Sequence, residues 1–304
     1  PKLFVDTADG NHGVSQVLRI NTDRSYDPDG FQLLFEWNCT SGTSSCSKLI
    51  SNTSSTLCEV LPNLMQPQVT YAFTVKALKS FDPSIYTTTT IRITATQETV
   101  PQVKFYQQNL DGNIANPQKA VRILALFEAN YRFLWSKSKG GSLVYDSAID
   151  SPNLVIREGS LDPGDTYTIQ VEVDSYPFFW TFYVNKPPGP GTFTVTPSKG
   201  SELSTVFKFQ ASNWTDPENH IPLTYSFGVL SETQTLSLSS KNTSAFLYSK
   251  LPYLGKNLKA YVEVYDSYAT KSGLEFPIQV ELSENFQEQE VVEDFKSQLA
   301  NSSF

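Results

Sequence analysis

Few side chains in this sequence can act as a base or a nucleophile at neutral pH. His12 lies in a Gly- and Asn-containing stretch and His220 follows a proline-containing turn, so both are interpreted as surface turn residues. The sequence has no Gly-x-Ser-x-Gly elbow, phosphate-binding loop, paired-cysteine zinc motif or His-Glu-x-x-His pair. It therefore predicts a protein that is not an enzyme and that uses no cofactor.

Four acidic residues near the N-terminus suit a hard cation. Asp27 and Asp29 flank Pro28 in a tight turn, and Asp6 or Asp9 is a candidate for a further ligand. Oxygen ligands gathered from loops are those that Ca²⁺ takes in proteins. We prefer the interpretation that Asp27 and Asp29 serve the turn itself, with a calcium site as the alternative.

The three cysteines, Cys39, Cys46 and Cys58, lie close together in a segment rich in Ser and Thr. Such polar surroundings do not bury thiols, which favours a disulfide between Cys39 and Cys46 and an oxidising compartment. Cys58 is then left over for another partner. The alternative is that all three are buried thiols.

Five Asn-x-Ser/Thr sequons are present, and their placement is more informative than their number. Asn52 and Asn242 lie in Ser/Thr-rich loops, and Asn38 points away from its neighbour Trp37, which is expected to face inward. The sequence predicts N-linked glycans at Asn38, Asn52, Asn213, Asn242 and Asn301.

These residues must be positioned by strands, because the composition is rich in aromatic residues, Ser and Thr and has a single Met. Leu161 to Val173 gives a Pro-Gly turn and then strict alternation of apolar and polar residues, which is typical of a half-buried strand. In immunoglobulin-like sandwiches a Tyr at such a strand entrance pins a corner through its hydroxyl. We expect corner tyrosines at Tyr71, Tyr167 and Tyr261.

The corner tyrosines are 96 and 94 residues apart, and an aromatic residue precedes each by 34, 32 and 34 residues, namely Trp37, Trp135 and Phe227. This period matches the size of one β-sandwich. The predicted fold is all-β, with three tandem immunoglobulin/fibronectin-III-like β-sandwiches. The alternative is one large β domain.

The predicted domains cover residues 1–98, 99–186 and 187–282, and the third begins within a Pro/Gly-rich connector. In the first we expect a short strand at residues 3–5, followed by a loop that contains His12. Residues 283–304 are expected to form an amphipathic helix, with Asn285 as its N-cap and an apolar stripe on one face.

The net charge of −8 argues against a nucleic-acid partner, because phosphate binding requires clustered Lys and Arg. No run of 18 apolar residues occurs, so this segment is not expected to insert into a membrane. The sequence has neither an initiator Met nor a signal sequence, and we interpret it as a mature product or an excised fragment.

Residues 15–282 resemble the region of the REJ (receptor for egg jelly) module in polycystin-type, egg-jelly receptor and ciliate surface proteins, most specifically at residues 184–228. The residues that carry this resemblance are 184–200 (VNKPPGPGTFTVTPSKG), 204–209 (STVFKF), 214–216 (WTD) and 222–227 (PLTYSF). The segments 25–30 (SYDPDG) and 35–37 (FEW) are similar to the PKD-like entrance of the same region. Cysteines often stand in that pattern where this chain has Phe193 and Ala211, so we expect packing to replace one disulfide.

The resemblance implies an extracellular, glycosylated, non-enzymatic array of β-sandwiches. Our leading interpretation is a structural or adhesive glycoprotein at the cell surface whose modules assemble end to end into a filament or stalk. Its partners would be copies of itself, other extracellular proteins or glycans. One alternative is the ectodomain of a polycystin-like membrane receptor or channel. Another is a carbohydrate-active enzyme that uses Asp27 or Glu218.

Overall fold

The computed structural model describes residues 1–42, 44–127 and 129–282 and consists almost entirely of strands, which confirms the predicted all-β class. The single helical element in these ranges is one turn of 3₁₀ helix, η1 (Ser47–Leu49). No helix of the described chain is long and apolar enough to span a bilayer. The predicted C-terminal helix at residues 283–304 lies outside the described residues.

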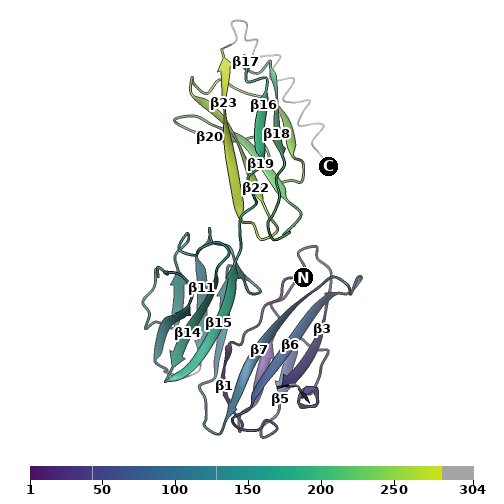
Figure 1. Cartoon of the computed structure of the whole chain (residues 1–304), viewed down its shortest axis with the longest axis vertical. Coiled ribbons are helices and arrows are strands. Elements are labelled where there is room, and N and C mark those ends of the chain that lie inside the picture. The colour runs from purple at the N-terminus through teal and green to yellow at the C-terminus, as the bar shows by residue number, and fades with distance from the viewer. Residues whose placement is uncertain (43, 128, 283–304) are drawn as a thin grey trace. The chain divides into compact units, whose positions relative to one another are not determined.

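The chain divides into two compact units, Pro1–Asn185 and the part that begins at Lys186. Figure 1 shows the strands of each. The first unit contains two hydrophobic cores and the second unit contains one. The three separate domain boundaries remain a prediction, because the first two cores belong to one compact body.

One long sheet runs through the first unit. Its strands, in spatial order, are β12 (Phe133–Lys139), β14 (Thr166–Val173), β15 (Tyr176–Val184), β1 (Asp9–Gly13), β7 (Tyr86–Thr96), β6 (Thr70–Lys79), β3 (Leu33–Ser41) and β4 (Ser44–Ser45). In addition, β10 (Ile114–Ala115) pairs with β15 and with β9 (Leu110–Asp111). The facing sheets are β13 (Asn153–Ile156), β11 (Val121–Phe127) and β8 (Val103–Gln108), and β2 (Leu18–Asn21) with β5 (Leu57–Val60).

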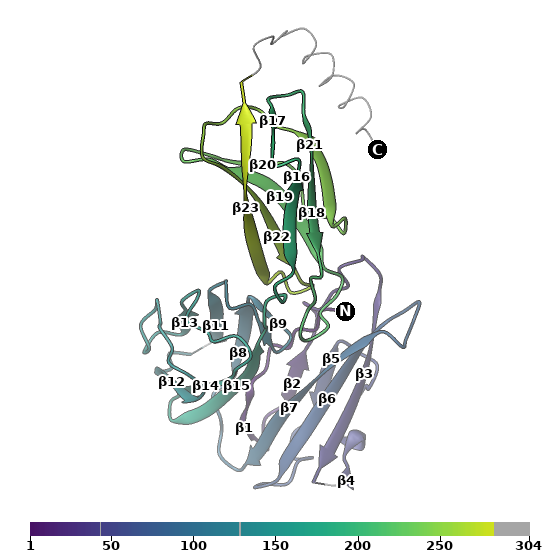
Figure 2. The ribbon, with the colours of Figure 1, turned by 45° about the horizontal axis from the view of Figure 1, so that its top comes forward.

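Strand β1 joins the two sandwiches of this unit (Figure 2). It pairs in parallel with β7 on one edge and antiparallel with β15 on the other. Gly10 takes part in both pairings, and a Cβ there would lie 2.9 Å from the Phe178 ring and 3.0 Å from the Pro177 carbonyl oxygen. A residue without a side chain is therefore required where the backbones approach most closely.

The N-terminal segment departs from the sequence-based expectation. The strand lies at Asp9–Gly13, where a loop was predicted, and residues 3–5 form no strand. Leu3 is buried in the first core and Ala8 in the second, so this segment contributes to both sandwiches. The predicted surface residue His12 is instead buried on β1, where burial lowers its pKa and Nε2 lies 3.2 Å from the Gln16 carbonyl oxygen.

Two of the three predicted corner tyrosines lie where they were expected. Tyr71 and Tyr167 are buried at the second positions of β6 and β14. The Tyr71 hydroxyl accepts a hydrogen bond from the Gln66 backbone N–H at 2.8 Å. The Tyr167 hydroxyl accepts from the Asp162 N–H at 3.1 Å and donates to its carboxylate at 3.0 Å. Each pins the loop that enters its strand.

The second unit is a single sandwich. Its sheets are β16 (Thr192–Thr196), β18 (Val206–Ser212) and β21 (Phe246–Lys250), and β17 (Lys199–Ser201), β23 (Lys271–Glu281), β22 (Leu258–Tyr265), β19 (Thr224–Leu230) and β20 (Thr235–Ser237). Phe193 and Ala211 are buried and directly paired across β16 and β18. The two positions at which packing was expected to replace a disulfide thus lie opposite each other in the core.

The predicted corner at Tyr261 is wrong. The inward positions of β22 are Leu258, Ala260, Val262 and Val264, so Tyr261 faces the opposite side. Its ring covers Gly228 on the neighbouring strand, where a Cβ would lie 2.3 Å from the ring. Tyr261 lies three residues beyond Leu258, the position that matches Tyr71. A shift by an odd number of residues moves a side chain to the other face of a sheet, and spacing alone did not reveal it.

Cross-strand pairs give a better marker of the repeated sandwich than the tyrosines. The buried aromatic residue of each sandwich faces a buried valine on the next strand, and these pairs are Trp37–Val75, Trp135–Val171 and Phe227–Val262. They define matched positions in the three cores.

Candidate functional site

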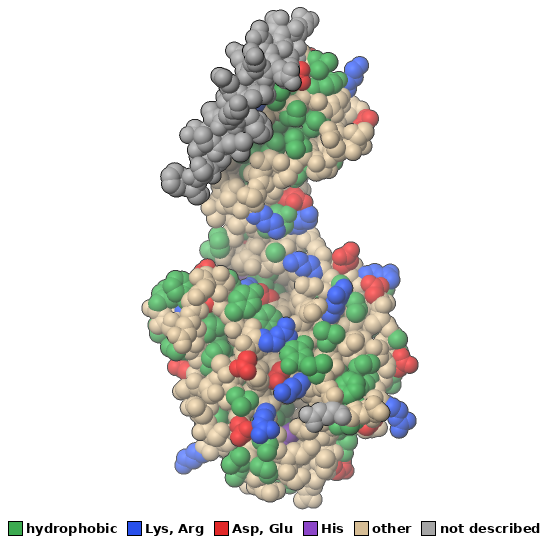
Figure 3. Space-filling view, turned by 180° about the vertical axis from the view of Figure 1, so that it is seen from behind, with side chains coloured by type: hydrophobic (Ala, Val, Ile, Leu, Met, Phe, Trp, Pro, Cys, Tyr) green, Lys and Arg blue, Asp and Glu red, His purple; other side chains and the backbone are tan. Residues whose placement is uncertain are grey.

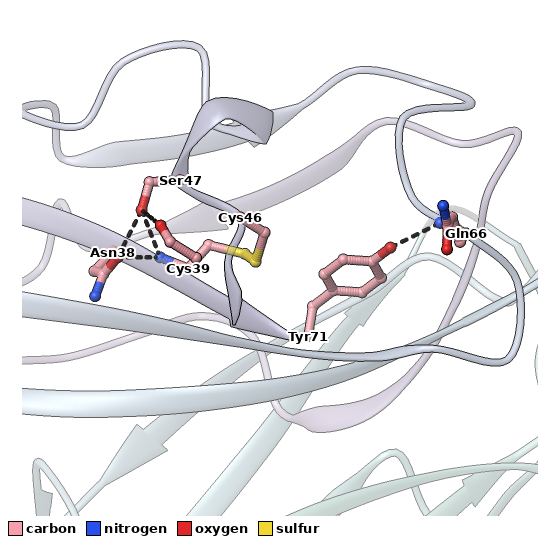
Figure 4. Close-up of a disulfide and its surroundings, with 7 residues drawn as sticks. Asn38, Cys39, Cys46, Ser47, Gln66 and Tyr71 are labelled. Carbon is pink, nitrogen blue, oxygen red and sulfur yellow. Dashed lines mark hydrogen bonds between the residues drawn. A yellow bond between two sulfur atoms is a disulfide. The ribbon is translucent and has the colours of Figure 1, made fainter. Parts of the chain in front are cut away.

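The disulfide joins the end of β3 to the segment that follows β4 (Figure 4). Cys39 and Cys46 are bonded, with their Cα atoms 4.8 Å apart, and the Cys46 N–H donates to the Cys39 carbonyl oxygen at 2.8 Å. Beside it, the side-chain oxygen of Asn38 accepts bonds from the Ser47 hydroxyl at 2.6 Å and the Cys39 N–H at 2.9 Å. The disulfide therefore stabilises a small hairpin at the surface.

Cys58 is not available for a partner. It is a free cysteine, fully buried on β5 opposite Ile20. Burial raises the pKa of its thiol to about 12, so the reactive thiolate is not formed at neutral pH. The expectation that Cys58 pairs with another chain is corrected, because such a bond would require this core to open.

Four predicted glycosylation sites lie on the exposed surface of the described chain, namely Asn38, Asn52, Asn213 and Asn242. Asn52 and Asn242 accept backbone N–H bonds from the residue two places on, which fixes local turns. Asn213 has a positive φ of 59°. The fifth sequon, at Asn301, lies outside the described residues. The exposure of these four leaves glycosylation there as a proposal.

The turn that contains Asp27 and Asp29 is held by a lysine. The ammonium of Lys79, at the end of β6, lies 3.1 Å from Asp27 Oδ1 and also bonds Asp29 Oδ2. The Asp27 side chain is fully buried, and its other oxygen has no hydrogen-bond partner. Bonding to Asp29 raises the pKa of Lys79, and that lysine in turn lowers the pKa of Asp29. An internal cation therefore occupies the position where calcium was considered.

Asp6 and Asp9 do not join this cluster. An oxygen of Asp6 accepts the Asn21 N–H at 2.8 Å, and one of Asp9 accepts the Arg92 N–H at 2.7 Å. Burial raises the pKa of both carboxyl groups. Both residues tie the N-terminal segment to neighbouring strands.

A second turn of the same form occurs in the other unit, at Asp216-Pro-Glu-Asn219. Asp216 Oδ1 accepts the backbone N–H groups of Glu218 at 2.9 Å and His220 at 2.8 Å. Its side chain is fully buried, and Oδ2 has no hydrogen-bond partner. The His220 ring is only one-fifth exposed and lies 3.6 Å from a Glu218 oxygen, so His220 is not the surface residue that was predicted.

Asp266, which follows β22, completes this cluster. It is buried, and its Oδ1 accepts the N–H groups of Tyr268 at 2.8 Å and Thr270 at 3.0 Å. One ligand atom each from Asp216, His220 and Asp266 lie within 4.8 Å of one another. Two carboxylates and an imidazole thus converge at one end of the sandwich.

Neither Lys79 nor Asp266 stands out in the sequence. Each lies four residues beyond the valine that pairs with the core aromatic residue, Val75 in one case and Val262 in the other. That cross-strand register is the signal that would have found them. This register cannot be obtained from the tyrosine spacing, because Tyr261 lies on the outward face of β22.

A hollow of about 300 Å³ lies beside β1, between residues that include Arg92, Asn113 and Trp180. Its one carboxylate, Asp9, already bonds to the Arg92 backbone. Figure 3 shows charged side chains of both signs interspersed with hydrophobic ones on the face that it presents.

Several solved arrays of β-sandwiches are similar to this chain. Domains A168–A170 of titin match at 11% identity over 92% of this chain and 98% of that chain, with a TM-score of 0.32. Chicken CNTN1 domains FN1–FN3 match at 12% identity over 91% and 98%, with a TM-score of 0.30. Protocadherin gammaB7 EC3-6 matches at 12% identity over 95% and 78%, with a TM-score of 0.24.

The family is shown by sequence. A family model described as the REJ domain matches residues 8–303, which is nearly the whole chain. The match includes both Asp-Pro turns and the strand that joins the first two sandwiches. The chain therefore belongs to the REJ domain family.

Proposed function

We propose that this chain is a non-enzymatic structural or adhesive module of an extracellular glycoprotein, and that its modules assemble into a surface filament or stalk. The REJ family match and the β-sandwich fold support the extracellular structural role. The disulfide supports an oxidising compartment. The exposed sequons are suited to N-linked glycans.

The observation that carries the proposal is the shared sheet of the first unit. Backbone hydrogen bonds on both edges of β1 hold two cores in one body. Two domains joined only by a linker move relative to each other by default, whereas continuous strand pairing restricts that motion. A stiff double module is suited to bearing load or holding a binding surface at a fixed distance.

The second unit offers a surface for association. In the described chain, β21 is an edge strand whose neighbour is β18. Phe246 and Tyr248 on β21 are both more than half exposed, with ring centroids 6.0 Å apart, and Val206 on β18 is half exposed. Edge strands and exposed apolar patches are common sites of chain association. We propose that copies of the chain, or other extracellular proteins, dock on this edge.

Electron microscopy and multi-angle light scattering of native material test the assembly. We expect elongated particles of regular width, and we expect the double substitution Phe246→Ser and Tyr248→Ser to shorten them. The matched control is Leu134→Ser, which removes a similarly exposed apolar side chain from β12. Short, monodisperse monomers in every preparation would contradict the filament. An intact-mass measurement with a peptide map tests the glycans and the disulfide together.

The second candidate is the ectodomain of a polycystin-like membrane receptor or channel. The REJ match favours it, because the module resembles a region of such proteins. The complete coding sequence distinguishes the two candidates. A membrane-spanning segment downstream of Phe304 would support the receptor, and a stop codon at that point would refute it.

A further inference from the structure

The two Asp-Pro turns are structurally matched, and they differ in the charge of the residue that faces them. In each turn the fourth residue donates its N–H to the carbonyl of the first, from Gly30 at 2.9 Å and from Asn219 at 3.2 Å, and both of these residues have positive φ. In each turn the first aspartate is fully buried and leaves Oδ2 without a hydrogen-bond partner. The two turns therefore place a buried carboxylate in the same way.

The facing strand supplies opposite charges. Lys79 and Asp266 occupy the same position, four residues beyond the valine that pairs with the core aromatic residue. In the first unit the lysine ammonium pairs with two carboxylates. In the second unit a buried aspartate stands in its place, within 4.8 Å of Asp216. Two ionised carboxylates at this distance repel each other, and a bound cation relieves that repulsion.

The donor set indicates which class of cation fits. Ca²⁺ takes oxygen ligands alone, whereas an imidazole with carboxylates suits divalent ions of the first transition series. His220 contributes the imidazole, and its backbone carbonyl accepts the Ser267 N–H at 3.1 Å, which joins its loop to the one that carries Asp266. We propose that Asp216, His220 and Asp266 bind a divalent transition-metal cation such as Zn²⁺ or Mn²⁺.

Binding requires the three donors to close around the ion. A tetrahedral zinc ion about 2.0–2.1 Å from each ligand separates two donor atoms by roughly 3.4 Å. The three donors lie within 4.8 Å of one another in the metal-free chain. We expect rotation of the His220 ring and an approach of the two carboxylates to supply the difference. Glu218, on the same turn, lies 3.6 Å from His220 Nδ1, the ring nitrogen that is also 4.0 Å from Asp216 Oδ1.

Calorimetric titration of the EDTA-treated full chain with ZnCl₂, MnCl₂ and CaCl₂ tests the proposal, with thermal unfolding as a second readout. We expect one zinc ion per chain and a rise in the unfolding midpoint of the second unit. Asp216→Asn and Asp266→Asn should each weaken zinc binding at least tenfold. Both changes keep an Oδ1 that accepts the same backbone N–H groups, so the loops remain in place.

The matched control is Asp27→Asn, which removes the equivalent carboxylate from the turn held by Lys79 and should leave zinc affinity and stoichiometry unchanged. His220→Gln separates the classes of ion, because it should weaken zinc binding and leave any calcium heat unaltered. Absence of zinc and manganese binding at millimolar concentration would overturn the proposal. Full zinc affinity in Asp266→Asn would overturn it as well, and so would binding of calcium alone.

A charge exchange gives an independent test. Asp266→Lys places the lysine of the first unit in the second, and it should abolish zinc binding, because an ammonium repels the metal ion and has no lone pair to donate to it. Zinc binding that survives this substitution would show that the Asp266 carboxylate is not a ligand.

Discussion

The first sandwich of the first unit and the sandwich of the second unit share a frame but differ at two matched positions. Both have a buried aromatic residue opposite a valine, and both have a turn with a buried aspartate. At the strand entrance one has Tyr71 and the other Leu258. At the C-terminal end of that strand, the first has Lys79 and the second has Asp266. The backbone frame is repeated, and the chemistry at its ends is not.

Packing constrains the middle of the sandwich more tightly than its ends. The Trp–Val or Phe–Val pair fills the core, where a change of volume is destabilising. At the C-terminal end of a strand, buried charges need only be balanced by nearby opposite charges. Lys79 supplies a cation to the buried aspartate of the first turn, whereas Asp266 brings a second carboxylate to Asp216 and His220.

The largest effect is expected from Lys79→Asp, which gives the C-terminal end of β6 the residue type that follows β22 in the second unit. Asp27 and Asp29 would lose their cation and face a third carboxylate. We expect the unfolding midpoint of the first unit to fall by on the order of 10 °C. Differential scanning calorimetry measures it, and added divalent cation should recover part of the loss.

The control for this substitution is Lys76→Asp, which makes the same charge change on the same strand. Lys76 is partly exposed and lies 3.9 Å from Glu36, so its contribution to stability should be small. Equal losses in the two variants would show that net charge, and not the buried turn, determines the effect.

A second contrast lies in β1 and β17. Each pairs in parallel with the last strand of its own sandwich, but only β1 is also paired on its other edge, with β15, whereas β17 ends its sheet in the described chain. Gly10→Val would place a side chain against Phe178. We expect a loss of about 2–3 kcal/mol, as for overpacking of a tight contact.

Hydrogen exchange locates the effect of Gly10→Val. Amides of β1, β7 and β15 should exchange faster, while those of the second unit should not change. Gly10→Ala, with a smaller side chain, should lose less. Unchanged exchange at β15 would mean that the pairing of β1 with β15 does not hold the two sandwiches together.

The sequence predicted the strands and cores well, because alternation and aromatic spacing are local signals. It did not predict that β1 joins two sandwiches, since pairing between distant segments leaves no local pattern. It also missed the cluster at Asp216. Asp266 looks like an ordinary turn residue until the register of β22 is known, and the regular spacing of Tyr261 concealed that register. The exchange of lysine for aspartate at the C-terminal end of this strand can be recognised only when the pairing of the strands is known.

The tyrosines allow the register to be tested directly. Tyr71→Phe and Tyr167→Phe each remove a buried hydroxyl that bonds the preceding loop, and each should destabilise the first unit by about 1 kcal/mol. Tyr261→Phe keeps the ring that covers Gly228 and should change the stability of the second unit by less than about 0.5 kcal/mol. Chemical denaturation measures all three. A loss at Tyr261 equal to that at Tyr71 would restore it as a corner residue.

The smallest effect concerns the pH dependence of the lysine-held turn. Lys79 lowers the pKa of Asp29 below its ordinary 3.8, so this interaction stabilises the folded state above about pH 4 and is lost as pH falls through the lowered pKa. Asp29 raises the pKa of Lys79 above 10.5, so the lysine contribution is present below that pH and is lost as pH rises through the raised value.

Thermal unfolding of the chain and of Asp29→Asn between pH 2 and 7 should give midpoints that differ at neutral pH and converge in acid. Because Asp29 is largely exposed, 0.5 M NaCl should shrink the difference. A difference that persists at pH 2 would mean that Asp29 stabilises the turn by some means other than its charge.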